Sequence, residues 1–236
     1  MKPTLHAFCI RRLASLLKIA ALPAIAAIAL PMGAHAQETV CGPEVKEAAA
    51  KELSALDGLN DEEKLAGQMQ IYEKYKFCIQ DVAQPDQNNF FIAARQCGAD
   101  VSHLGSRYYE EMSCCGYDPQ RRQFGCPVKI KQRFGFGGAP LPGSREFVLN
   151  CVADSNGVLQ PVGVDSVHLA NEQFGVNPTW QFAVITNANQ NLGLVQPMNG
   201  ATRRARSILS WGIQPNNCNF QPIWGNALNY RIRLDQ

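Results

Sequence analysis

Residues 126–134 read CPVKIKQRF, and the basic side chains Lys129, Lys131 and Arg133 occupy every second position. A period of two is typical of a strand with one face on a core and the other in water. A Gly- and Pro-rich connection follows at 135–144, and the stretch 146–153 predicts a second strand. The run beginning at residue 126 therefore marks the start of a β region.

The rest of the chain downstream continues this pattern. Asn156-Gly157 is a two-residue hairpin signal that leads into a strand over 158–169, where Pro161 requires an edge or a bulge. Further strands are predicted at 180–186, 192–195, 206–211 and 227–234. Several short strands separated by turn residues indicate a mainly antiparallel β-sandwich or partly closed barrel.

Upstream of residue 126 the apolar spacing is helical. Helices are predicted over 43–56 and 61–83, the second with Asn60 as its cap and Glu63 three residues later. Their short connection predicts an antiparallel hairpin. The apolar stripe expected on the second helix is Leu65, Met69, Tyr72, Tyr75, Ile79 and Val82. Residues 86–113 predict two further short helices, so the fold class is α+β.

The first 36 residues have the composition of a secretory signal peptide. Four basic residues precede an apolar run from Ile19 to Leu30, and Ala34-His35-Ala36 is a small-x-small cleavage pattern. The apolar run is shorter than the roughly 20 residues of a membrane-spanning helix. The expected division is a signal peptide over 1–36, a helical region with an acidic hairpin over 37–115 and an antiparallel β domain over 116–236. We expect no transmembrane segment after cleavage and a periplasmic or extracellular location.

Eight cysteines remain after cleavage, and an even number in an exported chain indicates disulfides. They are Cys41, Cys78, Cys97, Cys114, Cys115, Cys126, Cys151 and Cys218. Folding the helical hairpin about its turn predicts a Cys41–Cys78 bond. Mirroring the strands about 135–144 brings Cys126 near Cys151. The adjacent cysteines 114 and 115 are then expected to bond to Cys97 and Cys218.

Charge excludes general binding to nucleic acid or to anionic membranes. The chain has 22 Lys and Arg, four of them in the first 36 residues, against 20 Asp and Glu, so the mature chain is slightly acidic. Residues 37–84 carry the acidic excess, and basic residues gather at 121–133 and 203–206. This asymmetry favours contact between an acidic and a basic surface of partners or copies.

No motif predicts catalysis, a metal site or a cofactor. His168 lies three residues after Asp165, with Ser155 and Ser166 nearby, but no nucleophile elbow surrounds either serine. We interpret His168 and His103 as ordinary structural residues. Zinc at cysteines 97, 114, 115 and 126 is less favoured than disulfides in an oxidising compartment. A pair of acidic residues for glycoside hydrolysis needs no motif and stays open.

Aromatic residues give the one candidate surface. Trp180 is expected in the core, whereas Trp211 and Trp224 flank loops and could form, with Tyr230, a stacking surface for a sugar or a partner. The favoured function is a noncatalytic structural or accessory protein of a bacterial envelope or extracellular assembly, with a protein partner or self-assembly. The alternatives are a secreted glycan- or ligand-binding module and a secreted hydrolase.

Overall fold

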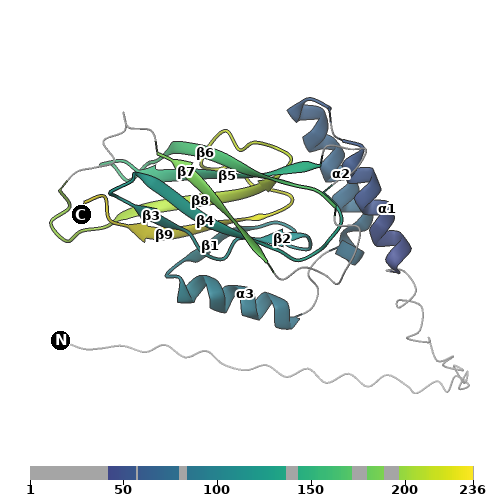
Figure 1. The fold of residues 1–236 in the computed structure, drawn as a ribbon, viewed down its shortest axis with the longest axis horizontal. Coiled ribbons are helices and arrows are strands. Elements are labelled where there is room, and N and C mark those ends of the chain that lie inside the picture. The colour runs from purple at the N-terminus through teal and green to yellow at the C-terminus, as the bar shows by residue number, and fades with distance from the viewer. Residues whose placement is uncertain are drawn as a thin grey trace, which may run out of the picture. The chain divides into compact units, whose positions relative to one another are not determined.

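The structure, a computed structural model, describes residues 42–56, 58–79, 84–136, 143–171, 180–188 and 197–235 (Figure 1). The predicted signal peptide, Cys41 and the strand predicted at 192–195 lie outside these ranges. The helices are α1 (Pro43–Ser54), α2 (Asp61–Ile79) and α3 (Gln84–Gln96). The strands are β1 (Asp100–Leu104), β2 (Glu110–Glu111), β3 (Gly116–Asp118), β4 (Gln123–Ile130), β5 (Ser144–Ala153), β6 (Leu159–Leu169), β7 (Gln181–Asn187), β8 (Arg203–Trp211) and β9 (Asn226–Ile232).

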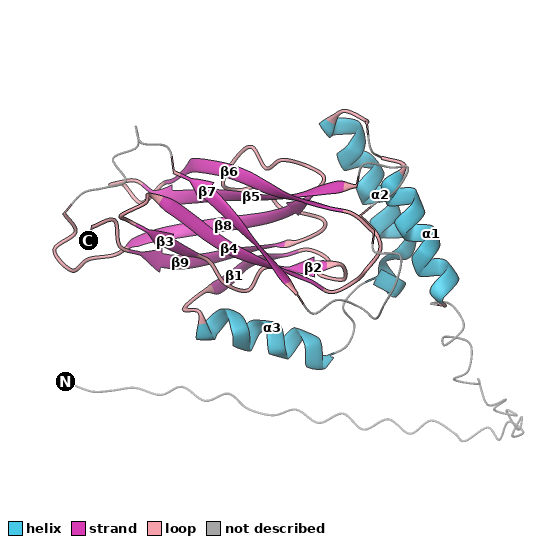
Figure 2. Ribbon diagram, viewed as in Figure 1, coloured by secondary structure: helices cyan, strands magenta, loops and turns pink. Residues whose placement is uncertain are grey.

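The strands form two antiparallel sheets, which confirms the α+β class (Figure 2). Five strands run in the order β1-β9-β8-β5-β6. In the second sheet β4 is central, because Gln123 and Lys129 each have a partner on both sides. β2 and β3 pair with one edge of β4, and β7 pairs with the other.

The inner faces of the two sheets share one apolar core. Val128 of β4, Val148 of β5 and Leu228 of β9 are all fully buried within the same cluster. The predicted alternation holds over β4 as far as Ile130, where Lys129 is exposed while its neighbours at 128 and 130 are buried. Residues 131–134, which the alternation predicted as a continuation of the strand, lie outside β4, and the Lys131 side chain is only 12% exposed. A smaller apolar cluster lies on the outer face of the five-stranded sheet and includes Cys151 and Cys218.

The turn between β5 and β6 forms as the sequence predicts. The Asp154 amide donates to the Val158 carbonyl at 2.8 Å, and Gly157 has φ +81°, which glycine adopts readily. β6 is the edge strand of its sheet, and the pairing register shifts beside Pro161. Pro161 thus occupies the edge and bulge that its missing amide hydrogen requires.

Helices α1 and α2 also form, and the Glu63 amide donates to the Asn60 side chain at 3.0 Å, as a helix cap does. The buried face of α2 differs from the prediction, because Gln68 and Ile71 are buried while Leu65 and Met69 are 38% and 47% exposed. The reason is the surface under the helix: Gln68 donates to the Trp211 carbonyl at 3.0 Å, which fixes the rotation of α2.

The prediction of two short helices over 86–113 is right for α3 and wrong for the second helix. That stretch contains β1 and β2, so the region 37–115 is not wholly helical. Val101 pairs with Leu228 of β9, more than 120 residues later in the chain. Pairing with a distant strand overrides an apolar spacing that fitted a helix.

Disulfides join Cys97 to Cys114, Cys115 to Cys126, and Cys151 to Cys218. Cys78 is also disulfide-bonded, and its predicted partner Cys41 lies outside the described residues. The predicted Cys126–Cys151 bond is wrong because β4 and β5 are in different sheets and do not form a hairpin. Cys126 belongs to the inner core, whereas Cys151 points to the outer cluster where Cys218 lies. Cys218 therefore does not bond to Cys114 or Cys115.

Candidate functional site

The predicted stacking surface does not exist, because its three aromatic residues are buried. Trp211, Trp224 and Tyr230 are only 3%, 1% and 5% exposed. The Trp211 indole donates to the Ser144 hydroxyl at 2.9 Å. Trp224 packs in the core, and burial raises the pKa of the Tyr230 phenol. The loops beside these residues are polar, but the aromatic rings themselves face inward and hold the helices and sheets together.

The prediction for Trp180 is wrong in the opposite direction. It was expected in the core, yet it is 44% exposed. Its carbonyl accepts a hydrogen bond from the Ile130 amide at 3.1 Å, so it extends the ladder between β4 and β7.

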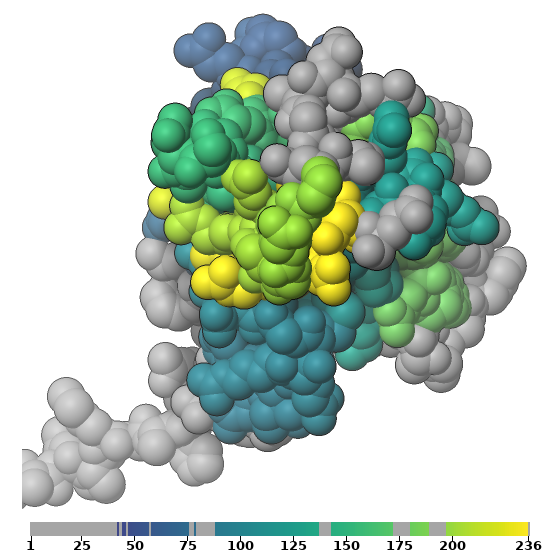
Figure 3. All heavy atoms as spheres, turned by 90° about the vertical axis from the view of Figure 1, so that its left-hand side faces the viewer, coloured from purple at the N-terminus to yellow at the C-terminus, as the bar shows by residue number. Residues whose placement is uncertain are grey.

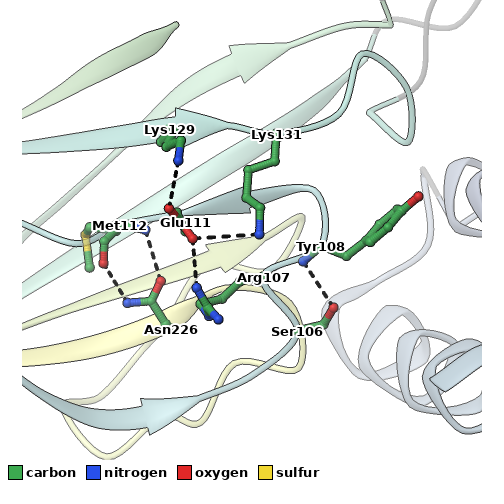
Figure 4. A network of polar contacts seen from close by, with 8 residues as sticks. All are labelled: Ser106, Arg107, Tyr108, Glu111, Met112, Lys129, Lys131 and Asn226. Carbon is green, nitrogen blue, oxygen red and sulfur yellow. Dashed lines mark hydrogen bonds and ion pairs between the residues drawn. The ribbon is translucent and has the colours of Figure 1, made fainter. Parts of the chain in front are cut away.

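A buried cluster of charges surrounds Glu111 (Figure 4). Arg107 contacts its carboxylate at 2.8 Å, and Lys129 and Lys131 contact it at 3.3 and 3.8 Å. The Arg107 side chain is 1% exposed and its guanidinium lies 4.0 Å from the centre of the Phe90 ring. One carboxylate shared by three cations in this geometry fixes the segment 106–112 between α3 and β4.

Asn226 completes the same region from β9. Its side-chain oxygen accepts from the Met112 amide at 3.0 Å, and its side-chain nitrogen donates to the Met112 carbonyl at 2.8 Å (Figure 4). The side-chain amide of Asn226 thus satisfies both backbone groups of Met112, as a neighbouring strand would. These contacts are made within the protein, and they stabilise it rather than present a group to a substrate.

Two further carboxyl groups, Glu110 and Glu146, lie in the core at 1% and 0% exposure. Burial, and secondarily the charge of Glu110, raises the pKa of Glu146 well above its ordinary value. Both carboxyl oxygens of Glu146 lack a hydrogen-bond partner within the described part of the chain. A hydrolytic carboxylate pair must flank the bond it cleaves. Complete burial denies that access to Glu146.

The histidines are not assembled into a catalytic group. Asp165 and His168 are three residues apart on β6, where they pair with Val148 and Arg145 and so point to opposite faces. Ser155 lies in the turn at the other end of that strand. His103 donates from its Nε2 to the Pro222 carbonyl at 3.0 Å, which is a structural contact.

The cysteines that could have been zinc ligands, at positions 97, 114, 115 and 126, are all disulfide-bonded. Over the described ranges, no three His, Cys, Asp or Glu side chains gather as a metal site. No helix in those ranges is long and apolar enough to cross a bilayer.

Three exposed surfaces stand out among the residues that the structure describes. Large apolar side chains lie along β7 and just before it: Trp180, Phe182 and Ile185, at 44%, 37% and 46% exposure. We call these three residues the β7 edge. Apolar residues also lie on α2 beside acidic ones, and arginines gather on β8 and β9. No protein-family model matches the chain, and a comparison with curated proteins finds none that matches.

Proposed function

We propose that this chain is an exported, noncatalytic structural or accessory protein of a bacterial envelope or extracellular assembly, and that it joins a protein partner through the β7 edge. The observation that carries the proposal is the exposure of Trp180, Phe182 and Ile185 around one strand. Phe182 and Ile185 are three residues apart on β7, so they lie on opposite faces of the strand. Large exposed apolar side chains are typical of protein interaction sites, and here they flank one strand on both faces.

The position of β7 in its sheet strengthens this proposal. Within the described residues its strand partner is β4 alone. An edge strand presents backbone groups to a strand of another chain, and proteins usually protect such edges with charges or proline. The residues of β7 itself, Gln181–Asn187, include neither. Backbone pairing and apolar contact could therefore act together at this edge.

The two alternative functions lose the residues on which they were based. A glycan-binding module needed Trp211 or Trp224 exposed beside a groove, and both are buried. A hydrolase needed His168 or an acidic pair to face a substrate. His168 and Asp165 face apart, and the pair Glu110 and Glu146 is enclosed.

The export pathway and the finer architecture belong to the same proposal. Three disulfides are typical of proteins that fold in an oxidising compartment. With the signal-peptide pattern at 1–36, they support a periplasmic or extracellular location. We further propose that a Cys41–Cys78 bond links the helical hairpin, and that the two sheets act as a sandwich carrying it.

The test is the size of the native protein isolated from its envelope without reductant. We expect a complex with another protein, and we expect the double substitution Phe182→Lys with Ile185→Lys to release the folded chain from that protein. The matched control is Ile92→Lys on α3, which changes an apolar residue of similar exposure, 52%, outside the β7 edge. Two results would contradict the proposal: a complex that survives the double substitution, or turnover of a chromogenic ester or glycoside that His168→Ala abolishes.

A further inference from the structure

Three arginines lie together on the outer face of β8 and β9. Arg204 of β8 is directly opposite Arg231 of β9, and Arg206 is opposite Asn229 in the next pair on that face. We call Arg204, Arg206 and Arg231 the arginine face. Figure 3 views the end of the molecule where the start of β8 and the end of β9, in yellow-green and yellow, come together. Like charges directly opposite each other in an antiparallel pair destabilise a sheet. A bound anion would therefore reduce the repulsion between Arg204 and Arg231.

Neutral groups hold these guanidiniums in place. Arg204 donates to the Gly157 carbonyl at 2.6 Å, and Arg231 donates to the Thr202 hydroxyl at 3.3 Å. Arg206 donates to the Asn229 side chain at 2.8 Å and to the Cys218 carbonyl at 3.0 Å. Within the described residues, none of the three arginines forms an ion pair.

Carboxylates near this face do not neutralise it. Asp235 pairs with Arg233 at 2.9 Å, and Asp154 accepts from the amides of its own turn. Asp100 of β1 lies opposite Asn229 on β9, so Asn229 separates its carboxylate from Arg206 on β8. Burial, and then the charge of Arg204, lowers the pKa of the Arg206 guanidinium. The arginine face thus keeps an excess of positive charge with its donors already oriented.

The complementary surface lies on α2 of the same chain. Asp61, Glu62 and Glu63 are exposed in its first turn, where the helix dipole favours negative charge. Leu65 and Met69 follow at 38% and 47% exposure. We call these five residues the acidic stripe. No ion pair involves its three carboxylates within the part of the chain that the structure describes.

The two surfaces lie at opposite ends of β8. Lys64 and Gln68 of α2 donate to the carbonyls of Gly212 and Trp211, at the end of the strand, whereas Arg204 is at its start. The seven residue-to-residue steps from 204 to 211 span about 23 Å of strand. One copy therefore cannot place its own acidic stripe on its own arginine face.

We propose that the acidic stripe of one copy docks on the arginine face of a second copy, head to tail. Val158, 55% exposed beside Gly157, offers an apolar contact for Leu65 or Met69 of the docked helix. A head-to-tail contact uses two different surfaces, so each added copy leaves one of each free, and the product is a chain or a ring. This inference rests on the proposed role in an assembly and names one of its contacts.

The expected strength is modest. Exposed ion pairs contribute little singly and are screened by salt. Association should therefore grow with protein concentration, weaken steadily with ionic strength, and matter most where copies are held close together.

Charge reversal in two variants tests the contact. The first variant is Arg204→Glu with Arg231→Glu, and the second is Glu62→Lys with Glu63→Lys. The average mass of the oxidised, exported protein is measured by sedimentation at low salt over a range of concentrations. We expect the wild type to associate and each variant alone to associate about tenfold more weakly. An equal mixture of the two should recover association, because each then meets an opposite charge.

The matched control is Arg121→Glu with Arg122→Glu, which reverses two exposed charges in the turn between β3 and β4. It should associate as the wild type does. Near-ultraviolet circular dichroism verifies that every variant is folded. A wild type that stays a single chain throughout, or reversed arginines without effect, would overturn the proposal. Binding to an acidic polysaccharide, lost on arginine reversal while the wild type remains a single chain, would reassign the face and also overturn it. The β7 substitutions report separately on the proposed function, because they leave both charged surfaces intact.

Discussion

Replacing both cysteines of the Cys151–Cys218 disulfide by alanine should destabilise the protein more than the same replacement at any other disulfide that the structure describes. This bond closes a loop of 67 residues, whereas Cys115–Cys126 closes one of 11. The entropy that a cross-link removes from the unfolded chain grows with the logarithm of loop length. That relation gives about 4.4 kcal/mol for the longer loop and about 2.8 kcal/mol for the shorter one at 25 °C.

The comparison of the two double substitutions isolates loop length. All four cysteines are buried, with exposures of 0% and 6% for the longer loop and 8% and 0% for the shorter, so the packing lost is similar. Urea unfolding of the oxidised proteins, followed by tryptophan fluorescence, measures both free energies. The longer-loop variant should be less stable than the shorter-loop variant by about 1.6 kcal/mol. Equal losses, or the reverse order, would refute the entropic reasoning.

Glu146→Gln should raise stability at neutral pH and flatten its dependence on pH. Because burial raises the pKa of Glu146 in the folded protein, the folded state holds this proton more tightly than the unfolded chain does. The protonated Glu146 therefore makes its full contribution to the free energy of unfolding below the ordinary pKa of 4.5. That contribution is lost as the pH rises through the pKa of the folded state. Urea unfolding at several pH values measures the slope, and the exposed Glu62→Gln should leave it unchanged; a slope that survives Glu146→Gln would contradict the assignment. Arg107→Ala should cost about 3–5 kcal/mol, since it breaks a buried ion pair. Lys129→Ala removes a 49% exposed partner of the same carboxylate and should cost at most about 1 kcal/mol, so equal losses would show that burial does not set the difference.

Local chemistry predicted most of the elements. The alternation at β4, the Asn156-Gly157 turn and the Asn60 cap each act over a few residues. The turn and the cap appear where the sequence placed them, and β4 overlaps the predicted run 126–134 as far as Ile130. The sequence did not predict β1, because its partner β9 is distant in sequence. The apolar spacing of this stretch also fits a helix, and spacing alone does not show which distant strand a segment pairs with.

The candidate sites required tertiary information. Trp211 and Trp224 were expected at the surface because their neighbours are loop-forming residues, but ring orientation depends on which strand face meets the core. The arginines at 203–206 were visible as a cluster, whereas their contact with Arg231 depends on the register of β8 and β9. Arg206, Arg231 and Arg233 lie within the strands predicted at 206–211 and 227–234, and Arg204 lies two residues before the first of them. This spacing was the signal that could have found the face.

The three disulfides have a simple order along the chain: 97 with 114, 115 with 126, and 151 with 218. Each of these six cysteines is bonded to its neighbour in the series, so none of these three loops is nested in or interlocked with another. A chain oxidised in the order in which it crosses the membrane would form these pairs directly, without reshuffling by an isomerase. Cys151 stays unpaired until Cys218, 67 residues later, has been made, so this interval is the step at which a wrong pair could arise.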